Sequence, residues 1–437
     1  MATRRAVLAV TAGVGGALAA ACGGQQAGGS EGGGAKALRA VTVRWAADWE
    51  ATFQPTIDPM MAKFRQQVPQ VTVSQEFTPG AEYYTKLQTS LAAGAMPDVS
   101  LMTTRWSAQW IRGTRGAYQP LDAMIKRDKV DVADYWPLEM PGFSDEQSRV
   151  HILPYDISVN LLFYNRALLQ QEGIAFPTAQ TTLDDMLAAA RRLTKAGPDG
   201  RVSTFGYDGF QTGGQFEFVI ERFGGALFDE KLTKCLMNSA GSVQAVQWWM
   251  ELRHKHHVAP LPAELTDLGG SEKAFGNGRV AMAIMGTPSV ARIRMYTLDW
   301  DVAPIPRGPK GDQLRSGGGG YGIAGKTDKA DESWALLKFL TSKETLAEMI
   351  GKSGRSIPGR KSVAEASTDA TKPPKNWPVA FKEAEKAKAI SFSLYPRGGD
   401  VLDEVGKGLG PIFNAGGDVK GQLDQMTAKI DAILASR

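Results

Sequence analysis

Trp45 and Asp48 belong to the segment WAADWE, which ends the first alternating stretch of the sequence. The alternation over residues 41–45 predicts a strand, so both side chains stand at its carboxyl end. A carbohydrate offers CH faces and many hydroxyls, and a site for it needs aromatic faces beside short polar acceptors and bidentate donors. Trp45 and Asp48 fit that need, and the alternative is a tryptophan that only packs at the strand end.

Trp106 holds the same kind of position one unit further along the chain. A short buried strand is predicted at residues 97–102, and Trp106 lies in the loop that follows it. Trp106 is therefore a second candidate for ligand contact, whereas Trp110 is expected to pack.

Tyr155 and Asp156 lie inside VHILPYDISVNLLFYN, residues 150–165. This stretch is strand-like for longer than one small sheet requires, and Pro154 interrupts it. We interpret it as a passage of the chain from one lobe to another, where side chains can face both lobes. The alternative is a hinge spacer without ligand contact.

Gly286 and Thr287 end a predicted strand and, with Pro288, begin a predicted helix. The backbone N–H groups at this helix start would face a cleft, where they could bind a polar or anionic group of a ligand.

The segment SGGGGY, residues 316–321, carries two nucleotide-binding patterns. Its glycines match a dinucleotide fingerprint, and residues 320–327 match a P-loop. Both patterns require a strand before the glycines and a helix directly after them, whereas the strand predicted at residues 321–324 falls inside the motif. We therefore expect no nucleotide, and Gly319 instead lets the backbone approach a ligand, with Tyr321 beside it.

The sequence predicts no cofactor, no metal site and no enzyme activity. His254 and His257 stand three residues apart at a predicted helix end, but no cysteine or carboxylate completes a tetrahedral set at the usual spacing. The acidic residues scatter over predicted helix faces without a convincing catalytic pair. Cys235 is expected to be a small buried apolar residue.

Residues 1–21 have the anatomy of an export signal. A twin-arginine-like pair, Arg4 and Arg5, precedes an apolar segment that is too short and too rich in glycine and alanine to span a bilayer. The following Ala-Ala-Ala-Cys resembles the lipobox of bacterial lipoproteins, which makes Cys22 the predicted lipid attachment site and residues 22–40 a flexible tether. Ordinary signal cleavage with an incidental cysteine is the alternative.

Loss of the signal would remove two arginines and leave 48 basic against 46 acidic residues, a net charge of about +2. This balance gives no reason to expect nucleic acid or an anionic membrane surface as a partner. With Cys22 acylated, Cys235 has no cysteine to pair with. Stability must therefore come from burial, and about 400 residues suffice for two sizeable cores.

Predicted strands alternate with predicted helices, which indicates an α/β fold with a mostly parallel sheet. Strands at residues 41–45, 71–77 and 97–102 alternate with helices that end near residues 68 and 93. Further along, the patterns predict helices at 181–194, 242–257, 270–276, 330–340 and 426–435, and strands at 280–285, 300–306 and 321–324.

Several motifs, in this order along the chain, resemble those of the family 1 extracellular solute-binding proteins, the receptors of sugar-type ATP-binding cassette (ABC) importers. They are AAGAMPDV at residues 92–99, LLFYNRAL at 161–168, TLDDM at 182–186, FGNGRVAMAIMG at 275–286 and ALLKFLTS at 335–342. The third has Leu183 where the family usually has tryptophan. The resemblance runs from about residue 41 to the C-terminus.

The resemblance implies a two-lobe, periplasmic-binding-protein-like α/β fold with three interlobe crossings that closes on its ligand by hinge motion. It places lobe 1 at residues 41–154 plus 319–352, and lobe 2 at residues 155–305 plus 358–437.

The same resemblance implies four further ligand contacts. Gln215 would belong to the wall of the second lobe, and Arg355 to the third crossing. Tyr395 and Arg397 would come from a late segment of the chain. For Arg355 a plain surface position is the alternative.

Three functions remain open on the sequence alone. The first is a monomeric receptor, lipid-anchored to the outer face of the cytoplasmic membrane, that binds a carbohydrate and delivers it to the permease subunits of an ABC importer. The second is a receptor for a phosphorylated polyol, such as glycerol phosphate or a glycerophosphodiester, with Arg355, Arg397 and the helix start at Thr287 as its anion site. The third is an exported glycoside hydrolase with paired carboxylates.

Overall fold

The computed structural model describes residues 37–114, 116–198, 201–209, 216–366, 369 and 371–436. The described residues all belong to one compact unit, Ala37–Arg437. The predicted export signal, Cys22 and Gln215 lie outside the described residues.

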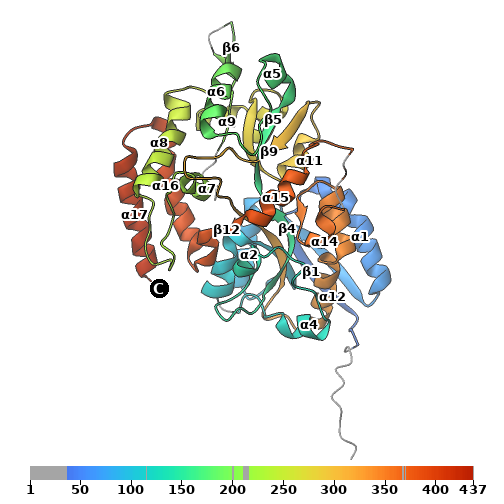
Figure 1. Ribbon diagram of the computed structural model, residues 1–437. Coiled ribbons are helices and arrows are strands. Elements are labelled where there is room, and N and C mark those ends of the chain that lie inside the picture. The colour runs from blue at the N-terminus through green and yellow to red at the C-terminus, as the bar shows by residue number, and fades with distance from the viewer. Residues whose placement is uncertain are drawn as a thin grey trace, which may run out of the picture. The chain divides into compact units, whose positions relative to one another are not determined.

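A seven-stranded mixed sheet is the frame of the first lobe (Figure 1). Its order is β11-β4-β10-β3-β1-β2, and β12 pairs with β10 outside this path. Strand β1 pairs in parallel with β2 and β3, but β10 runs antiparallel to β3 and β4. The prediction of a mostly parallel sheet is therefore wrong in this half, because β10 enters the sheet on its return from the second lobe. The strands are β1 (Val41–Ala47), β2 (Val71–Phe77), β3 (Val99–Thr103), β4 (Ile152–Ser158), β10 (Arg315–Ile323), β11 (Ile357–Pro358) and β12 (Lys388–Ala389).

Helices and this sheet enclose one apolar core, which includes Val43, Leu101, Ile323 and Trp334. Helix α1 illustrates how the helices contribute to this core: its buried residues recur every three or four positions and so form one apolar face toward the sheet. The helices are α1 (Gln54–Gln67), α2 (Ala81–Ala92), α3 (Thr104–Ala108), α4 (Asp122–Arg127), α12 (Ala330–Leu340), α13 (Lys343–Leu346) and α14 (Lys361–Ala364), with turns η1 (Ala51–Phe53), η2 (Gln109–Gly113), η3 (Met140–Phe143) and η4 (Ala347–Lys352).

The second lobe contains a three-stranded antiparallel sheet in the order β8-β5-β9. Its strands are β5 (Asn160–Asn165), β8 (Met282–Gly286) and β9 (Trp300–Ala303), and β6 (Lys195–Ala196) pairs separately with β7 (Val202–Thr204). The helices are α5 (Arg166–Gln171), α6 (Leu183–Leu193), α7 (Phe216–Glu221), α8 (Ala240–His254), α9 (Pro262–Asp267), α10 (Ser271–Gly276), α11 (Ser289–Ile293), α15 (Pro378–Lys386), α16 (Gly398–Ala415) and α17 (Val419–Ala435), with the turn η5 (Ser391–Leu394).

Local sequence signals explain where several of these elements begin. Helix α6 starts at a capping box, in which the Thr182 side chain accepts from the Asp185 N–H and the Asp185 side chain accepts from the Thr182 N–H. Its basic residues Arg191 and Arg192 stand in the last turn, where they complement the helix dipole. The predicted N-cap is confirmed.

Three passages of the chain join the two apolar cores. Core membership changes within β4, where Tyr155 packs in the first core and Ile157 in the second. It changes again between η4 and β11, and along β10, where Leu314 directly before the strand packs in the second core and Tyr321 packs in the first. The two-lobe architecture is confirmed, and the exact residue limits of the lobes stay predictions.

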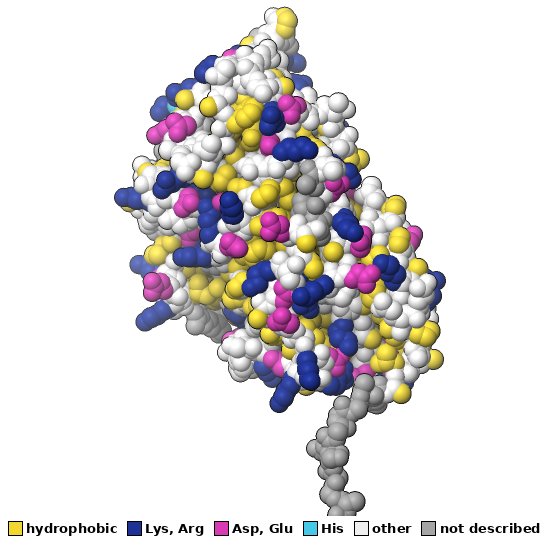
Figure 2. All heavy atoms as spheres, turned by 45° about the vertical axis from the view of Figure 1, so that its right-hand side comes forward, with side chains coloured by type: hydrophobic (Ala, Val, Ile, Leu, Met, Phe, Trp, Pro, Cys, Tyr) yellow, Lys and Arg dark blue, Asp and Glu magenta, His cyan; other side chains and the backbone are white. Residues whose placement is uncertain are grey.

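The described helices and the face of the molecule in Figure 2 bear on contact with membranes and charged partners. No helix among the described residues combines the length and the apolar character that a bilayer crossing needs. On the face drawn in Figure 2, basic and acidic side chains are interspersed.

Candidate functional site

A cavity of about 440 Å³ lies between the two lobes, and both lobes contribute to its wall. This volume is within the range of about 300–1,000 Å³ that small-molecule sites occupy. The wall includes residues that follow β1 and residues of β4, β5, β8 and β10. The lining residues are Asp48, Glu50, Phe53, Gly80, Thr103, Thr104, Arg105, Tyr155, Asp156, Ser158, Asn160, Gly286, Pro288, Ser289, Arg292, Ser316, Gly317, Gly318, Gly319, Arg355, Ile390 and Phe392.

Six of the residues predicted from the sequence come together at this cavity, although they lie far apart along the chain. They are Asp48, Tyr155, Asp156, Gly286, Gly319 and Arg355. Their role in binding a ligand stays a prediction.

Arg355 lines the cavity and contacts two aromatic rings. Its Cζ is 4.6 Å from the ring centroid of Trp49 and 4.6 Å from that of Phe53. The two rings are nearly perpendicular, at 78°, so the guanidinium sits in the corner that they form. One Nη is 3.8 Å from Oδ1 of Asp48, and the side chain is only 12% exposed. Cation–π contact with both rings restricts the position of the guanidinium, and a lysine lacks its planar fork.

Asp48 and Asp156 both face this guanidinium. Burial raises the pKa of each carboxyl from 3.8 to about 6, while the positive charge of Arg355 acts in the opposite direction. Oδ1 of Asp156 accepts the N–H of Gly319 at 2.8 Å. Oδ1 of Asp48 and Nε of Arg355 are buried without a hydrogen-bond partner among the described residues. The cavity therefore presents an acceptor and a donor that a ligand could satisfy.

The glycine run of β10 is required by its close approach to neighbouring protein atoms. A Cβ on Gly318 would lie 2.1 Å from the backbone oxygen of Asp156, and a Cβ on Gly319 would lie 2.3 Å from Cε1 of Tyr155. The strand predicted at residues 321–324 in fact begins at Arg315 and includes the whole run. A strand through the glycines leaves no phosphate-binding loop there, in agreement with the rejection of a nucleotide site.

Three further predicted residues lie behind the cavity wall. Trp45 has no exposed surface and packs edge-to-face on Tyr321, 5.9 Å between ring centroids, in the first core. Thr287 is fully buried, and its hydroxyl lies 3.2 Å from that of Ser356. The sequence pattern correctly placed Trp45 near a strand end, but its side chain is buried in the core. Asp48, three residues later, lines the cavity.

Trp106 and the late segment also lie away from the cavity lining. The ring of Trp106 is half-buried, 6.1 Å from that of Tyr84. Tyr395 is buried in the second core and donates to the carbonyl of Ile433 at 3.1 Å. Arg397 precedes α16 and pairs with Asp400 at 2.7 Å. None of the three lines the cavity, since Tyr395 and Arg397 contact residues at the end of α17, and their role in ligand contact stays a prediction.

Several lining residues were not predicted. Glu50 and Phe53 follow Asp48 within five residues, so the strand-end argument could have found them. Ser289 and Arg292 belong to α11, directly after Gly286. Nothing in the sequence singles out Arg105, which lies over the ring of Trp106 at 5.2 Å and forms no ion pair within the described part of the chain.

Glu50 and Arg292 connect the lobes at one flank of the cavity. Nη2 of Arg292 is 2.6 Å from Oε1 of Glu50, and its Nη1 is 3.1 Å from Oε1 of Glu272. The hydrogen bond from Arg292 lowers the pKa of Glu50, so this carboxylate is ionised at neutral pH.

The side chains that could bind a metal ion are considered next. Among the residues that the structure describes, no group of three or more His, Cys, Asp or Glu side chains is placed to hold a metal ion. Nε2 of His254 lies 3.1 Å from the carbonyl oxygen of Phe413. Cys235 is fully buried, as expected for a small apolar residue, and burial raises its pKa to about 11.

Known proteins share both the sequence pattern and the fold. The family model of the bacterial extracellular solute-binding proteins matches residues 47–347. The erythritol/L-threitol-binding protein of Mycolicibacterium smegmatis is 22% identical over 342 residues, 72% of this chain and 70% of that protein. An ABC substrate-binding protein from Listeria monocytogenes, solved in complex with cycloalternan, has a TM-score of 0.82 at 21% identity, covering 91% of this chain and 99% of that one. UgpB from Mycobacterium tuberculosis, solved with glycerophosphocholine, has a TM-score of 0.74 at 19% identity, covering 90% and 98%.

Proposed function

From the premise that this chain belongs to the family of bacterial extracellular solute-binding proteins, we propose that it binds a carbohydrate in its interlobe cavity and delivers it to an ABC transporter permease. Membership of this family places its work outside the cytoplasm. The proposal concerns the ligand class and the residues that hold it.

One observation carries the proposal: the guanidinium of Arg355, in cation–π contact with Trp49 and Phe53, faces Asp48 and Asp156. Adjacent hydroxyls of a sugar both accept and donate hydrogen bonds. They can accept from the guanidinium and donate to the two carboxylates at once. Oδ1 of Asp48, which is ion-paired with Arg355 at 3.8 Å, and Nε of Arg355 have no hydrogen-bond partner among the described residues, so they are the acceptor and donor that such a ligand would satisfy.

The relatives support a ligand rich in hydroxyls. Cycloalternan in the Listeria monocytogenes protein and erythritol or L-threitol in the Mycolicibacterium smegmatis protein share this chemistry and differ in size. They support the class of ligand and leave its length open.

A phosphorylated polyol is the second candidate, and Arg105 favours it. This guanidinium lines the cavity without an ion pair in the described part of the chain, so it could meet a phosphate. UgpB, solved with glycerophosphocholine, shares the fold. The anion site predicted from the sequence is not assembled, since Arg397 and Thr287 do not line the cavity and Arg355 faces two carboxylates. We rank a neutral sugar first.

No turnover is proposed. Asp48 and Asp156 share the cavity, a pair that the sequence did not reveal, and a glycoside hydrolase also uses two carboxyls. In this cavity the guanidinium of Arg355 lies beside both carboxyls, and the relatives named above are binding proteins. We propose that this pair binds hydroxyls and does no acid–base chemistry.

Attachment to the membrane is a separate proposal that rests on the sequence. Residues 1–21 would direct export, Cys22 would carry the lipid, and the protein would act as a monomer at the outer face of the cytoplasmic membrane. Cells that express the chain should hold it in the membrane fraction, and Cys22→Ser should release it. An unchanged membrane fraction for Cys22→Ser would count against the anchor.

A thermal-shift screen tests the ligand class. The protein is heated with neutral sugars and polyols and with their phosphorylated counterparts, and each mixture is then analysed for products. A ligand that binds only the native state raises the unfolding temperature by mass action. We expect shifts from neutral sugars with the sugar recovered intact. Shifts from phosphorylated compounds alone would favour the second candidate, and product formation would contradict a binding role.

A further inference from the structure

We propose that Glu50 and Arg292 form an interlobe clasp, an ion pair that fastens the lobes across one flank of the cavity and sets how long a bound ligand stays. The inference rests on the proposed function for its biological meaning, but the clasp itself can be measured without any ligand.

The two partners belong to different lobes. Glu50 directly follows Trp49, which is buried in the first core, whereas Arg292 lies in α11 between Val290 and Ile293, which are buried in the second core. Their charged atoms are 2.6 Å apart, a charge-assisted hydrogen bond. In Figure 1, α11 lies on the same side of the molecule as α1, which follows Glu50 after η1. The contact therefore crosses from lobe to lobe.

Arg292 is held in position by its own lobe. Oε1 of Glu272 accepts from Nη1 of Arg292 at 3.1 Å and from the hydroxyl of Ser289 at 2.6 Å. Because Glu272 already orders the guanidinium, pairing with Glu50 loses less side-chain entropy than a pair of free side chains would. Arg292 is thus presented toward the first lobe before any ligand arrives.

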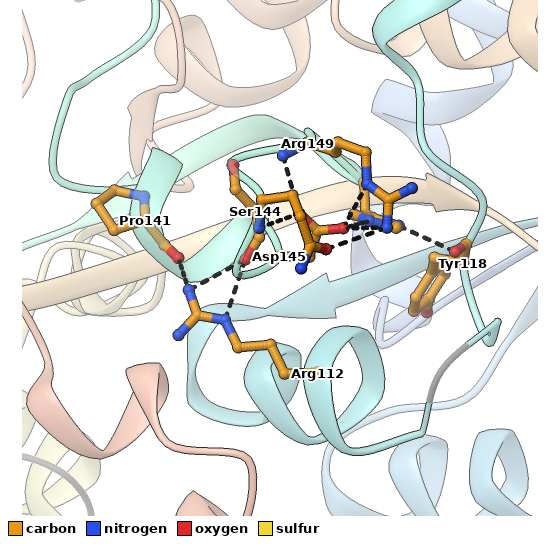
Figure 3. Close-up of polar contacts among 8 residues, drawn as sticks. Arg112, Tyr118, Pro141, Ser144, Asp145 and Arg149 are labelled. Atoms are coloured by element: carbon orange, nitrogen blue, oxygen red, sulfur yellow. Dashed lines mark hydrogen bonds and ion pairs between the residues drawn. The ribbon is translucent and has the colours of Figure 1, made fainter.

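The clasp differs in kind from a second interlobe contact, which Arg112 makes. The guanidinium of Arg112 donates to the carbonyls of Pro141 and Ser144 in the first lobe, at 2.6 and 3.0 Å (Figure 3). It also donates to the carbonyl of Leu394 in η5 at 2.5 Å. Backbone carbonyls do not titrate, and salt screens such contacts little, so we expect this contact to persist when salt is added.

Glu50 and Arg292, in contrast, can separate. Their side chains are 38% and 40% exposed, so water and ions reach the pair. An exposed ion pair shifts an equilibrium by about two- to fivefold. That size suits a contact that favours the closed arrangement yet allows the lobes to part for ligand entry and release.

The test measures the distance between the lobes without ligand. Spin labels are placed on exposed helical positions, Gln66→Cys in α1 and Ala188→Cys in α6, in the full chain carrying Cys22→Ser. Cys235 is buried and stays unlabelled. Distance distributions are then recorded for this protein, for Glu50→Gln and for Glu272→Gln, at low salt and in concentrated sodium chloride.

We expect Glu50→Gln to lengthen the interlobe distance at low salt and to make it insensitive to salt. In the unsubstituted protein the interlobe distance should increase toward the value of Glu50→Gln as salt is added. Glu272→Gln is the matched control, because it removes the same charge but leaves both partners of the interlobe pair. It loses only the carboxylate that orders Arg292, so its distance should lengthen less than that of Glu50→Gln at low salt.

Two results would overturn the clasp: an unchanged distance in Glu50→Gln at low salt, or an equal lengthening in Glu272→Gln. With any sugar that binds, Glu50→Gln should also release it about two- to fivefold faster. If no sugar binds, the proposed function fails while the ligand-free distances still decide the clasp.

Discussion

Arg355 is the residue on which the proposed site depends most. Its guanidinium contacts the faces of two rings and faces two carboxyls, so its planar fork matters as much as its charge. Of the ligand residues suggested by the family resemblance, Arg355 lies at the cavity and Arg397 does not. The sequence could suggest both, because each is an arginine in a loop. It could not rank them, because the fold alone decides which loop reaches the cavity.

The first prediction concerns these two arginines. Arg355→Lys keeps the charge but loses the planar fork, so we expect the dissociation constant of a bound sugar to rise more than tenfold in calorimetric titration. Arg397→Lys makes the same change outside the cavity and should leave affinity unaltered. The reverse pattern would place the site at the start of α16.

The second prediction concerns pH. Burial raises the pKa of Asp156 from 3.8 to about 6. A carboxyl whose pKa is raised by folding stabilises the protein below the unfolded value and loses that contribution as pH rises through the folded value. Relative to Asp156→Asn, the free energy of unfolding of the unsubstituted protein should therefore fall between pH 4 and pH 7.

Urea unfolding of both proteins across that range measures the difference directly. Other titrating groups are common to the two proteins and largely cancel. A difference that stays constant with pH would mean that Asp156 does not titrate in this range, and the account of the buried carboxyl would be wrong.

At the scale of elements, strand β10 shows what patterns in the chain could and could not reveal. The strand predicted from the sequence began only at Tyr321, after the glycines, whereas the structure extends it back to Arg315. The glycines are needed because β4 and Thr104 pack against the backbone too closely for any Cβ. That requirement comes from a partner more than 150 residues away in sequence, which local propensity cannot register.

The third prediction belongs to this strand. In Gly318→Ala the new Cβ would lie 2.1 Å from the backbone oxygen of Asp156, so β4 and β10 must separate. We expect a clear loss of unfolding free energy, about 1–3 kcal/mol, and weaker sugar binding. Gly406→Ala in α16 is the matched control.

At Gly406 no atom lies within 4 Å of a new Cβ, and alanine favours a helix over glycine by about 0.5–1 kcal/mol. That variant should be as stable as the unsubstituted protein or more so. Equal stability of the two variants would show that β4 and β10 are less closely packed than the structure indicates.

For the whole molecule, the order of loose motifs along the chain predicted the two-lobe fold, and the family match and the solved structures confirm it. The alternation of strands and helices also located most elements of the first lobe. The antiparallel entry of β10 was missed, since strand direction depends on how the chain returns from the second lobe.

The composition of the site was less predictable than the fold. Asp48, Asp156 and Arg355 were each suggested, but for separate reasons, and nothing in the sequence joined them. Trp45 fitted the chemistry and yet packs in the core, because a strand-end tryptophan is used equally well for burial. Which of the suggested side chains meet in one cavity is decided by the whole fold.

A crystal structure with the sugar that gives the largest thermal shift tests the central claim most directly. We predict ligand density in the interlobe cavity, with sugar hydroxyls within hydrogen-bond distance of Asp48, Asp156 and Arg355. Ligand density centred on Trp106, Tyr395 or Arg397, with no ligand atom in contact with Asp48, Asp156 and Arg355, would contradict the account.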